Sequence, residues 1–577
     1  MRYLVTSALP YINGIKHLGN LAGSMLPADV HARFRRMQGH EVLFICATDE
    51  HGAPAELAAE EAHQPVHIYC DEQHALQKRI YEGFRLSFDW FGRTSSIENH
   101  RLTQHFSQKL ENHGLIAERK TEQLYSVEDG RFLPDRYVEG TCPHCGYNNA
   151  RGDQCDSCGN LLDPTELINP RSKISGSTQL ELRETVNLFL LQQKMQTRVH
   201  DWVERSTGWP VLAKSIAEKW LAEGLKERSI TRDLSWGIPV VDKEGNPRPG
   251  FENKVYYVWF DAPIGYISAT QQWAAITGQS WQVWWLDATD VEYIQFMGKD
   301  NVAFHTVSFP ITLLGSQEPW KKVDRLKAFN WVNWYGDKFS TSHKRGIFMD
   351  QALALLPPDY WRWYLMANAP EGGDFSFTWE SFQATCNSDL ANNLGNFVNR
   401  VTRFADTRFQ GRVPQDGVPG EHEGHLFREL EERLSRLRRF HEQIEIKKAA
   451  SETRAIWNLG NEYLTLAAPW TTIKTDPVKA GVAIRIALNL CVLFAQVARP
   501  FIPDTAERIS EAFHLSPNQL SWPSASSVET LLDNLNASSS FEPPPVLFHK
   551  IEDEWVRAQL ERFQGQAVTN SCADSEA

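Results

Sequence analysis

The sequence lacks an excess of positive charge. Its 59 Lys and Arg are outnumbered by 72 Asp and Glu, so the formal net charge at pH 7 is -13. A protein that coats nucleic acid or an anionic membrane without specificity needs a net positive surface. The composition therefore argues against both of those classes, although it is compatible with a local basic patch.

The sequence also lacks a secretory leader and a long uninterrupted apolar run. Its first residues, Met1 to Thr6, lead directly into a strand-like segment, without a charged start and a long apolar region. The longest apolar stretch, residues 486–498, is interrupted by Asn489 and Gln496, whereas a helix needs about 20 apolar residues to span a bilayer. These absences predict a cytoplasmic protein with no membrane segment.

Cysteine is scarce and unevenly distributed. Four of the 9 Cys lie between positions 142 and 158 as two Cys-x2-Cys pairs, and the rest are scattered. Two such pairs supply four thiolates for tetrahedral Zn²⁺ and leave no open coordination position, which is typical of a structural site in a reducing compartment. We therefore predict one structural zinc at Cys142, Cys145, Cys155 and Cys158; redox or disulfide chemistry is the alternative.

Length and composition indicate a large globular protein. At roughly 150 residues per domain, 577 residues correspond to about three to five domains. Apolar residues make up 42% of the chain, with 30 Phe and 20 Trp, so several packed cores can form.

The order of local patterns predicts a split α/β domain followed by helices. Residues 3–8 and 42–47 are predicted strands, with a helix over 28–36 between them. Strand-like runs return at 254–260 and 293–297, after a Gly-, Pro- and Cys-rich insertion at about 118–230. Beyond about residue 385, apolar residues recur at helical spacing, as in 426–446 and 477–498. The fold class is therefore α/β: a Rossmann-type parallel sheet with a zinc-knuckle insertion, then an all-α bundle.

Two short motifs have the chemistry of a nucleotide site. His17-Leu18-Gly19-Asn20 follows the first strand at the start of a helix, where free N–H groups and the helix dipole favour a phosphate. Gly19 lacks a Cβ, which would let a base or ribose approach the backbone. The basic, hydroxyl-rich segment from Gly336 to Gly346 can close over a triphosphate. Taken singly, each motif is equally compatible with a packed histidine or a solvated loop.

Together these motifs resemble the two nucleotide signatures of the methionyl-tRNA synthetases, which are class I aminoacyl-tRNA synthetases. His17-Leu18-Gly19-Asn20 is similar to the first signature, and Lys338-Phe339-Ser340-Thr341-Ser342 is similar to the second. The resemblance extends from residue 3 to about 560. Its most specific stretches are Ala8-Leu9-Pro10-Tyr11, Phe44-Ile45-Cys46-Ala47-Thr48-Asp49, Tyr257-Val258-Trp259-Phe260-Asp261-Ala262-Pro263-Ile264-Gly265-Tyr266 and Gly298-Lys299-Asp300.

The resemblance implies ATP-dependent ligation of L-methionine to tRNA(Met) through methionyl-adenylate. Asp49 would hold the methionine ammonium, and aromatic faces would enclose the thioether, a contact worth about 0.3–1.5 kcal/mol per sulfur–aromatic pair. The implied methionine pocket consists of Leu9, Tyr11, Asp49, Trp259, Ala262, Pro263, Tyr266 and His305.

The methionine carboxylate would attack the α-phosphate of Mg²⁺-bound ATP, with no protein nucleophile. Catalysis would depend on positioning and on donors aimed at the phosphate oxygens. The implied catalytic residues are His17, Asn20, Lys338, Ser340, Thr341, Ser342 and Lys344, and the implied ATP ligands are His17, Gly19, Asn20, Arg232, Lys299, Asp300, Lys338 and Thr341.

The chain departs from the family pattern at two of these positions. Asn20 stands where the family usually has a second histidine, and Thr341 stands where it usually has a second lysine. We hypothesise that Lys344 or Arg345 supplies the missing loop charge.

Further implications concern the metal and the tRNA. Some relatives carry a second knuckle, but Ser126, Asp129, Ser172 and Ser175 occupy the positions expected for its cysteines, so one zinc is predicted. Asn396, Arg400, Pro469 and Trp470 would read the anticodon of initiator and elongator tRNA, Trp470 by stacking on a base. The Arg433 to Arg439 cluster is either a phosphate contact or a solvated, ion-paired helix face.

The resulting domain plan has six parts, and the chain is expected to act as a monomer. The parts are 1–117 and 231–325 (halves of the catalytic domain), 118–230 (knuckle insertion), 326–385 (second signature and stem contact), 386–560 (anticodon-binding helices) and 561–577 (flexible tail).

Two other functions compete with this interpretation. A synthetase for leucine, isoleucine or valine would usually need a large editing insertion, because one methylene provides only about 1–3 kcal/mol of discrimination. The insertion here is too small for that purpose. A non-catalytic zinc- and RNA-binding protein is the second alternative, which the loss of a lysine at Thr341 favours and the otherwise intact pocket disfavours.

Overall fold

A five-stranded parallel sheet forms the centre of the catalytic region. The structure, a computed structural model, describes residues 1–153, 155, 157–158, 160, 162–339, 345–524, 527–535 and 539–563. The strand order is β14-β13-β1-β2-β3 and every neighbouring pair is parallel. The bounds are β1 Arg2–Ser7, β2 Glu41–Thr48, β3 Trp90–Arg93, β13 Val291–Gly298 and β14 Arg325–Phe329.

The strand order reverses at the centre of this sheet. From β1 the chain builds outward through β2 to β3, and later returns on the other side of β1 with β13 and β14. The carboxyl ends of β1 and β13 therefore border a topological switch point, which is where open α/β sheets bind their ligands.

Both faces of the sheet are buried. Along β1, Tyr3 and Val5 belong to one hydrophobic core and Leu4 to another, as alternation in a strand requires. The helix predicted over 28–36 is α2 (Leu26–Met37), which continues α1 (Leu18–Asn20) and the π-helical turn η1 (Leu21–Met25). The other helices of this region are α3 Ala53–Glu61, α4 Val66–Gly83, α5 Ile97–Asn112, α6 Gln196–Arg205, α7 Val211–Ala222, α9 Gly265–Thr277, α10 Gln282–Trp285 and α11 Phe309–Gly315.

The strand predicted over 254–260 is wrong. Only β12 (Val255–Tyr256) is extended, and it pairs with β11 (Thr231–Arg232) outside the main sheet. The chain then forms one helical turn, α8 (Val258–Asp261), closed by the Ala262 N–H bonding to the Val258 carbonyl (2.8 Å). The aromatic and β-branched residues of this run have strand propensity, but tertiary packing overrides it.

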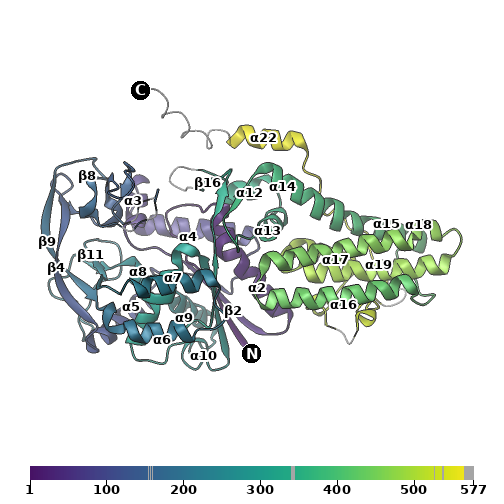
Figure 1. Ribbon diagram of the computed structural model, residues 1–577, viewed down its shortest axis with the longest axis horizontal. Helices are drawn as coiled ribbons and strands as arrows, with labels where there is room; N and C mark the ends of the chain where they lie inside the picture. The colour runs from purple at the N-terminus through teal and green to yellow at the C-terminus, as the bar shows by residue number, and fades with distance from the viewer. Residues whose placement is uncertain are drawn as a thin grey trace.

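A long antiparallel arm extends from the sheet, at the left of Figure 1. Its two main strands are β4 (Ile116–Ser126) and β9 (Leu180–Leu190), which pair along their whole length. Between them lie β5 Arg131–Phe132, β6 Val138–Thr141, β7 Ala150–Arg151 and β8 Ile168–Ser172, and β10 Arg228–Ser229 closes the sheet beside β9.

A small mixed sheet and two helices connect the catalytic region to the bundle. The sheet order is β16-β15-β17, with β15 Val332–Trp334, β16 Asp337–Lys338 and β17 Phe375–Phe377. The helices are α12 Met349–Leu355 and α13 Pro358–Ala367.

The C-terminal region is helical, at the right of Figure 1. Its elements are α14 Trp379–Thr385, η7 Cys386–Gly395, α15 Asn396–Phe409, α16 Glu421–Glu442, α17 Ile446–Ala467, α18 Pro469–Thr472, α19 Pro477–Ala498, α20 Pro503–Ala512, α21 Val528–Leu531 and α22 Asp553–Phe563. The stretch predicted as helical over 426–446 is interrupted by a turn at 443–445. The last helix, α22, returns to pack on α14, with Trp379 and Trp555 rings 5.4 Å apart.

Helix α19 is long and apolar enough to span a bilayer. The prediction considered only residues 486–498 and therefore underestimated the length of the apolar segment. The helix has 22 residues and a mean hydropathy of 1.9 over its most apolar window, but 94% of that window is buried inside the structure. The helix is apolar on all sides because other helices surround it.

A buried arginine fixes the bundle to the catalytic region. Arg362, on α13, is fully buried and pairs with Asp29 of α2 (Nη2–Oδ2 2.7 Å). Its other N–H groups donate to the carbonyls of Phe84, Pro500 and Phe501. The hydrophobic core that includes β1 also continues into the bundle, so the two regions are packed as one body.

Candidate active site

The carboxyl ends of β1 and β2 bring Tyr11 and Asp49 together. The Asp49 N–H donates to the Pro10 carbonyl (2.8 Å), and the Ile12 N–H donates to the Asp49 carbonyl (2.9 Å). These two backbone hydrogen bonds place Asp49 at the switch-point edge of the sheet.

The Asp49 carboxyl is buried and incompletely paired. The residue is 6% exposed, and its Oδ1 has no hydrogen-bond partner. Burial raises its pKa well above the ordinary value, and repulsion from Asp261 and Glu50 adds to that effect. A buried carboxyl that is destabilised as an anion is suited to a cationic ligand group.

Aromatic side chains stand beside this carboxyl. The rings of Trp259 and Phe304 stack with centroids 3.8 Å apart, and Tyr11 meets Trp259 edge to face at 6.3 Å. Phe304 begins the π-helical turn η6 (Phe304–Ser308), directly before His305.

Tyr266 and His305 form a second, polar part of the predicted methionine pocket. The Tyr266 hydroxyl lies 2.8 Å from His305 Nε2, and His305 Nδ1 lies 2.8 Å from the Asn301 carbonyl. Because a carbonyl only accepts, Nδ1 carries the proton and Nε2 accepts from Tyr266. Burial lowers the pKa of His305 to about 4, so the imidazole is neutral at pH 7.

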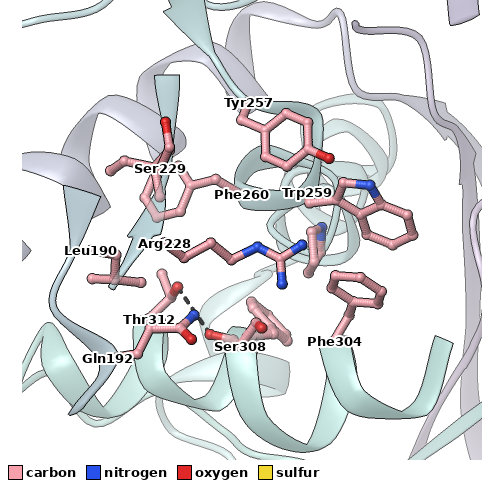
Figure 2. A pocket seen from close by; sticks show the side chains of 13 residues that line it. Leu190, Gln192, Arg228, Ser229, Tyr257, Trp259, Phe260, Phe304, Ser308 and Thr312 are labelled. Atoms are coloured by element: carbon pink, nitrogen blue, oxygen red, sulfur yellow. Dashed lines mark hydrogen bonds between the residues drawn. The ribbon is translucent and has the colours of Figure 1, made fainter. Parts of the chain in front are cut away.

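The remaining predicted pocket residues lie on the same elements. Ala262 and Pro263 join α8 to α9, and Leu9 follows β1 and packs toward Gly265, where a Cβ would lie 3.5 Å from Leu9 Cδ1. Figure 2 shows the internal cavity behind the Trp259–Phe304 stack, into which Arg228 points. It measures about 20 Å³, room for one water molecule, and of the predicted methionine-pocket residues only Trp259 and Pro263 line it.

The first signature begins a helix, as predicted. His17 is the N-cap residue of α1, and its N–H donates to Asn20 Oδ1 (3.3 Å), so Asn20 caps the helix start. The Nδ1 atom of His17 is buried without a partner. A Cβ on Gly19 would lie 3.0 Å from the His17 ring. Gly19 therefore makes room for His17, a reason different from the expected approach of a base.

The first and second signatures are adjacent. The rings of His17 and Phe339 stack at 4.9 Å, and Leu18 N–H donates to the Ile347 carbonyl beyond the loop (3.1 Å). Lys338, which precedes Phe339, has its Nζ 4.5 Å from the Trp331 ring centroid. The two motifs thus border one site, although more than 300 positions separate them in the chain.

Lys299 reaches the same tryptophan. Its Nζ is 4.3 Å from the Trp331 ring centroid and pairs with Asp374 (2.8 Å). Asp300, the next residue, also interacts with Trp331. The carboxyl end of β13 thereby joins the basic cluster around Lys338.

Arg232 has different neighbours. It pairs with Asp135 (Nε–Oδ2 3.0 Å) and lies over the Tyr257 ring at 3.7 Å, so its assignment to ATP stays a prediction. Ser340, Thr341, Ser342 and Lys344 lie outside the described residues. Arg345 is described and stands 3.9 Å from Asp337, next to Lys338.

The four clustered cysteines meet in space. The Cys142–Cys158 and Cys145–Cys155 sulfur distances are 3.9 and 3.6 Å, and all four sulfurs lie within 4.8 Å of one another. Tetrahedral Zn²⁺ with bonds of about 2.3 Å separates its sulfurs by about 3.8 Å. The donor set therefore fits a zinc ion.

The predicted anticodon residues share one face of the bundle. Arg400 and Asn396 are exposed on α15, and the Arg400 guanidinium lies 4.7 Å from the Trp470 ring centroid. Trp470 follows Pro469 in α18, after Ala468 in the left-handed region (φ 42°), and meets Phe404 edge to face at 5.1 Å.

Comparisons with known proteins agree with this arrangement. Residues 3–402 match the family model described as "tRNA synthetases class I (M)", and residues 413–568 match the "Anticodon binding domain of methionyl tRNA ligase". The methionine–tRNA ligases of Hyphomonas neptunium and Maricaulis maris are each 62% identical to this chain, over 98% of it and 99% of the relative. The chain belongs to the methionyl-tRNA synthetase family. The resemblance drawn from the signatures, the α/β fold class and the assignment as a ligase are thereby confirmed.

Solved methionyl-tRNA synthetases share the fold. The Mycobacterium tuberculosis enzyme bound by methionyl-adenylate superposes with a TM-score of 0.76 at 22% identity, covering 95% of this chain and 100% of that one. Its ligand-free form gives a TM-score of 0.70 at 21% identity, over 96% and 98%.

At the positions where some members of the family carry the cysteines of a second knuckle, this chain has side chains that hydrogen-bond to one another and to the backbone. Asp129 N–H donates to Ser126 Oγ (3.1 Å), Ser175 Oγ donates to Asp129 Oδ2 (3.2 Å), and Ser172 Oγ accepts from Ile174 N–H (3.1 Å). Burial raises the pKa of Asp129, but the hydroxyls of Ser126, Ser172 and Ser175 outweigh it, so the net pKa is lowered. The four side chains stabilise the turn without thiolates.

Two site residues were missed by the reasoning from sequence. Phe304 stacks on Trp259 of the predicted methionine pocket, and its one signal in the sequence was its place beside His305. Lys16, next to His17, is a buried ammonium at the same edge of the sheet, and it was given no role in the sequence analysis.

Proposed function

We propose that this chain activates L-methionine with ATP and transfers it from methionyl-adenylate to tRNA(Met), initiator and elongator, as a cytoplasmic monomer. The observation that carries this proposal is the buried Asp49 carboxylate, whose Oδ1 has no partner, at the switch-point edge, beside an aromatic wall and on the same edge as His17. The family membership supports the same reaction.

Methionine binding would depend on the Asp49 carboxylate and on the aromatic side chains beside it. Asp49 takes the ammonium, which relieves the cost of its buried charge, and the Tyr266–His305 pair and Leu9 fix the side chain. The stacked Trp259 and Phe304 rings offer aromatic surface to the thioether. A substrate that lacks the ammonium or the thioether would leave Asp49 or the ring faces unpaired.

ATP would lie along the first signature, with its charge facing the basic cluster. The start of α1 and the His17 imidazole face the α-phosphate, while Lys338 and Lys299 face the departing pyrophosphate. Asn20 and the loop residues Ser340, Thr341, Ser342 and Lys344 complete this role, and Gly19, Arg232 and Asp300 position the nucleotide. Mg²⁺ accompanies ATP and neutralises its phosphates. The chain itself orients two bound substrates for in-line attack.

One structural zinc at the four cysteines would hold the end of the arm. We expect metal analysis of the purified chain to give about one Zn per chain, and Cys145→Ser together with Cys158→Ser to abolish binding. Loss of the knuckle should impair tRNA charging more than adenylate formation, because the arm lies outside the sheet that carries the pocket. Ser126→Ala is the matched control and should keep the full zinc content; a fall in zinc with this variant would contradict the single-site assignment.

Trp470 would stack on an anticodon base, with Asn396 and Arg400 at base edges and Pro469 fixing the turn. We expect Trp470→Ala to lower kcat/KM for tRNA about 5- to 150-fold, because base stacking contributes about 1–3 kcal/mol. Trp470→Phe keeps a ring and should lose less. Methionine-dependent exchange of pyrophosphate into ATP should be unchanged in both variants. Normal charging by Trp470→Ala would exclude this residue from RNA contact.

Methionine-dependent exchange between ATP and pyrophosphate is the test of the whole proposal. Exchange with methionine, absent with leucine, isoleucine or valine, is the expected result. Exchange with one of those three amino acids instead would favour the related synthetases. No exchange, with tRNA still bound, would favour a non-catalytic RNA-binding protein.

A further inference from the structure

Lys16 is a buried cation between the two halves of the proposed site. It precedes His17 in the loop from β1 to α1, and the residue is 6% exposed. Its Nζ donates to Asn13 Oδ1 (2.9 Å), and its backbone carbonyl accepts from Met349 N–H (3.0 Å). In the described ranges, no carboxylate lies within ion-pair distance of this ammonium. Burying a charge without a counterion is costly, so such a group usually serves a ligand.

Three titratable groups, Asp49, Arg136 and His17, interact electrostatically with the Lys16 ammonium. Burial lowers its pKa to about 7, Asp49 raises it, and Arg136 lowers it further. The same ammonium in turn lowers the pKa of His17. Lys16 therefore lies close enough to both Asp49 and His17 to interact with each electrostatically.

Asp49 and His17 belong to different substrates in the proposed function, on which this inference rests. Methionine held at Asp49 has its carboxylate next to its ammonium, and a nucleotide held at His17 must present its α-phosphate to that carboxylate. The two reacting groups can meet only between Asp49 and His17. Lys16 lies in the loop that leads from Tyr11, which pairs with Asp49, to His17, and its Nζ is bonded to Asn13 of that loop.

We propose that Lys16 is a further catalytic residue whose ammonium binds the oxygens of the methionine carboxylate and the α-phosphate as they react. A carboxylate oxygen forms a bond to the α-phosphorus, the bond from that phosphorus to the bridging oxygen breaks, and pyrophosphate leaves with the electron pair. No proton is transferred, and Lys16 stays protonated. Its charge reduces the repulsion between two anions and stabilises the transition-state oxygens.

The departures from the family pattern fit this assignment. Asn20 and Thr341 are neutral where the family usually has a histidine and a lysine. Asn20 is moreover used as a helix cap, through the His17 N–H. Lys16 supplies a cation three residues after Asn13 and four before the uncharged Asn20.

The decisive variant is Lys16→Met, which keeps the length of the side chain and removes its charge. We expect the kcat of methionine-dependent exchange to fall about 100-fold or more, the order found for removal of one transition-state donor. The melting temperature should be unchanged or higher, because a buried unpaired charge is gone. Lys219→Met, at an exposed position of helix α7, is the matched control and should behave as the parent chain does.

Two readouts separate catalysis from a structural role. A small alkylammonium ion should restore part of the exchange rate of Lys16→Ala, but not that of Lys16→Met, whose side chain fills the space. The kcat/KM of the parent should fall as pH rises above about 7, where Lys16 loses its proton, and the Lys16→Met profile should lack this fall. Of the groups that interact with Lys16, His17 is neutral throughout this range, because its pKa is lowered to about 3. Asp49, whose pKa is raised well above its usual range, and Arg136 are present in both chains, so comparing the two profiles isolates Lys16.

The parent chain in the same assay distinguishes the two possible failures. Exchange by the parent together with an unchanged rate in Lys16→Met would overturn the role of Lys16 and leave the proposed function intact. A rise in KM for methionine alone, with kcat unchanged, would also overturn it, since Lys16 would then act only through Asp49. Absence of exchange in the parent would contradict the proposed function and this inference with it.

Discussion

Replacing Asp49 with asparagine is expected to lower kcat/KM for methionine in the exchange reaction by about 30- to 5,000-fold. The methionine ammonium would be left in a buried site without its counterion, and truncating one partner of a buried charge pair costs about 2–5 kcal/mol. The KM for ATP should change little, because Asp49 faces the amino acid. Initial rates over a matrix of both substrate concentrations measure the two effects separately.

Although Asp49→Asn should lower activity, it should raise the thermal stability of the chain. Burial, Asp261 and Glu50 raise the pKa of Asp49 above its unfolded value. The folded chain therefore binds more protons, so this carboxyl favours folding at low pH and the contribution is lost as pH rises through the folded-state pKa. At pH 7 to 8, Asp49→Asn should melt at a higher temperature than the parent, with a gain that disappears in acid.

Asp261→Asn is a useful comparison for stability, because Asp261 is one of the acidic residues that raise the pKa of Asp49. Asp261 is fully buried but is paired with His51 Nδ1 (2.7 Å) and Asn99. Its Oδ1, like that of Asp49, has no partner and its pKa is also raised, but replacing the residue weakens the two hydrogen bonds to Oδ2, so it should destabilise the fold. If Asp49→Asn and the parent had equal activity at low methionine concentration, Asp49 would not be part of the methionine-binding site.

The parts of the site that sequence reasoning located were those with a local signature. Strands β1, β2 and β13 appear as apolar runs, and the cysteine knuckle is defined by spacing within 17 residues. His17 and Lys338 came from motifs; Lys338 lies on β16, outside the main sheet, and the contacts of His17 with Phe339 and of Leu18 with Ile347 bring the two motifs together. Here the local pattern and the tertiary arrangement agree.

The parts that could not be predicted depend on contacts across the fold. Residues 254–260 have strand propensity, yet Trp259 is needed on a helical turn so that its ring can stack on Phe304. Lys16 becomes unusual only when tertiary packing removes water from its ammonium. Neither effect is encoded in the spacing of neighbouring residues.

The switch-point topology explains why residues so distant in sequence share one site. Asp49 ends β2, His17 begins the helix after β1, and Lys299 ends β13, so three adjacent strands each deliver one charged or polar group to the same edge. The packing of α13 against α2, through Arg362 and Asp29, fixes the position of the bundle relative to this edge of the sheet. A tRNA that contacts Trp470 therefore meets a catalytic region whose orientation is already set.

Replacing His17 with alanine is the second substitution with a large expected effect. We expect kcat for exchange to fall about 100- to 1,000-fold, as for loss of a donor to the reacting phosphate, with little change in KM for methionine. His17→Asn retains a short donor and should lose less. Burial, helped by the charge of Lys16, lowers the pKa of His17 to about 3, so the neutral imidazole acts and the rate should show no His17 ionisation between pH 6 and 8.

The lowered pKa also gives His17→Ala a signature in stability. The unfolded chain takes up a proton on His17 near pH 6.5 and the folded chain does not until about pH 3, so this residue's contribution to stability falls as pH drops through that window. At pH 7 the parent should be the more stable, because the imidazole stacks on Phe339. The difference in melting temperature between parent and variant should narrow as pH falls from 7 to 5. A difference independent of pH would show that His17 has the same pKa in the folded and unfolded chains, and the buried, permanently neutral imidazole would be wrong.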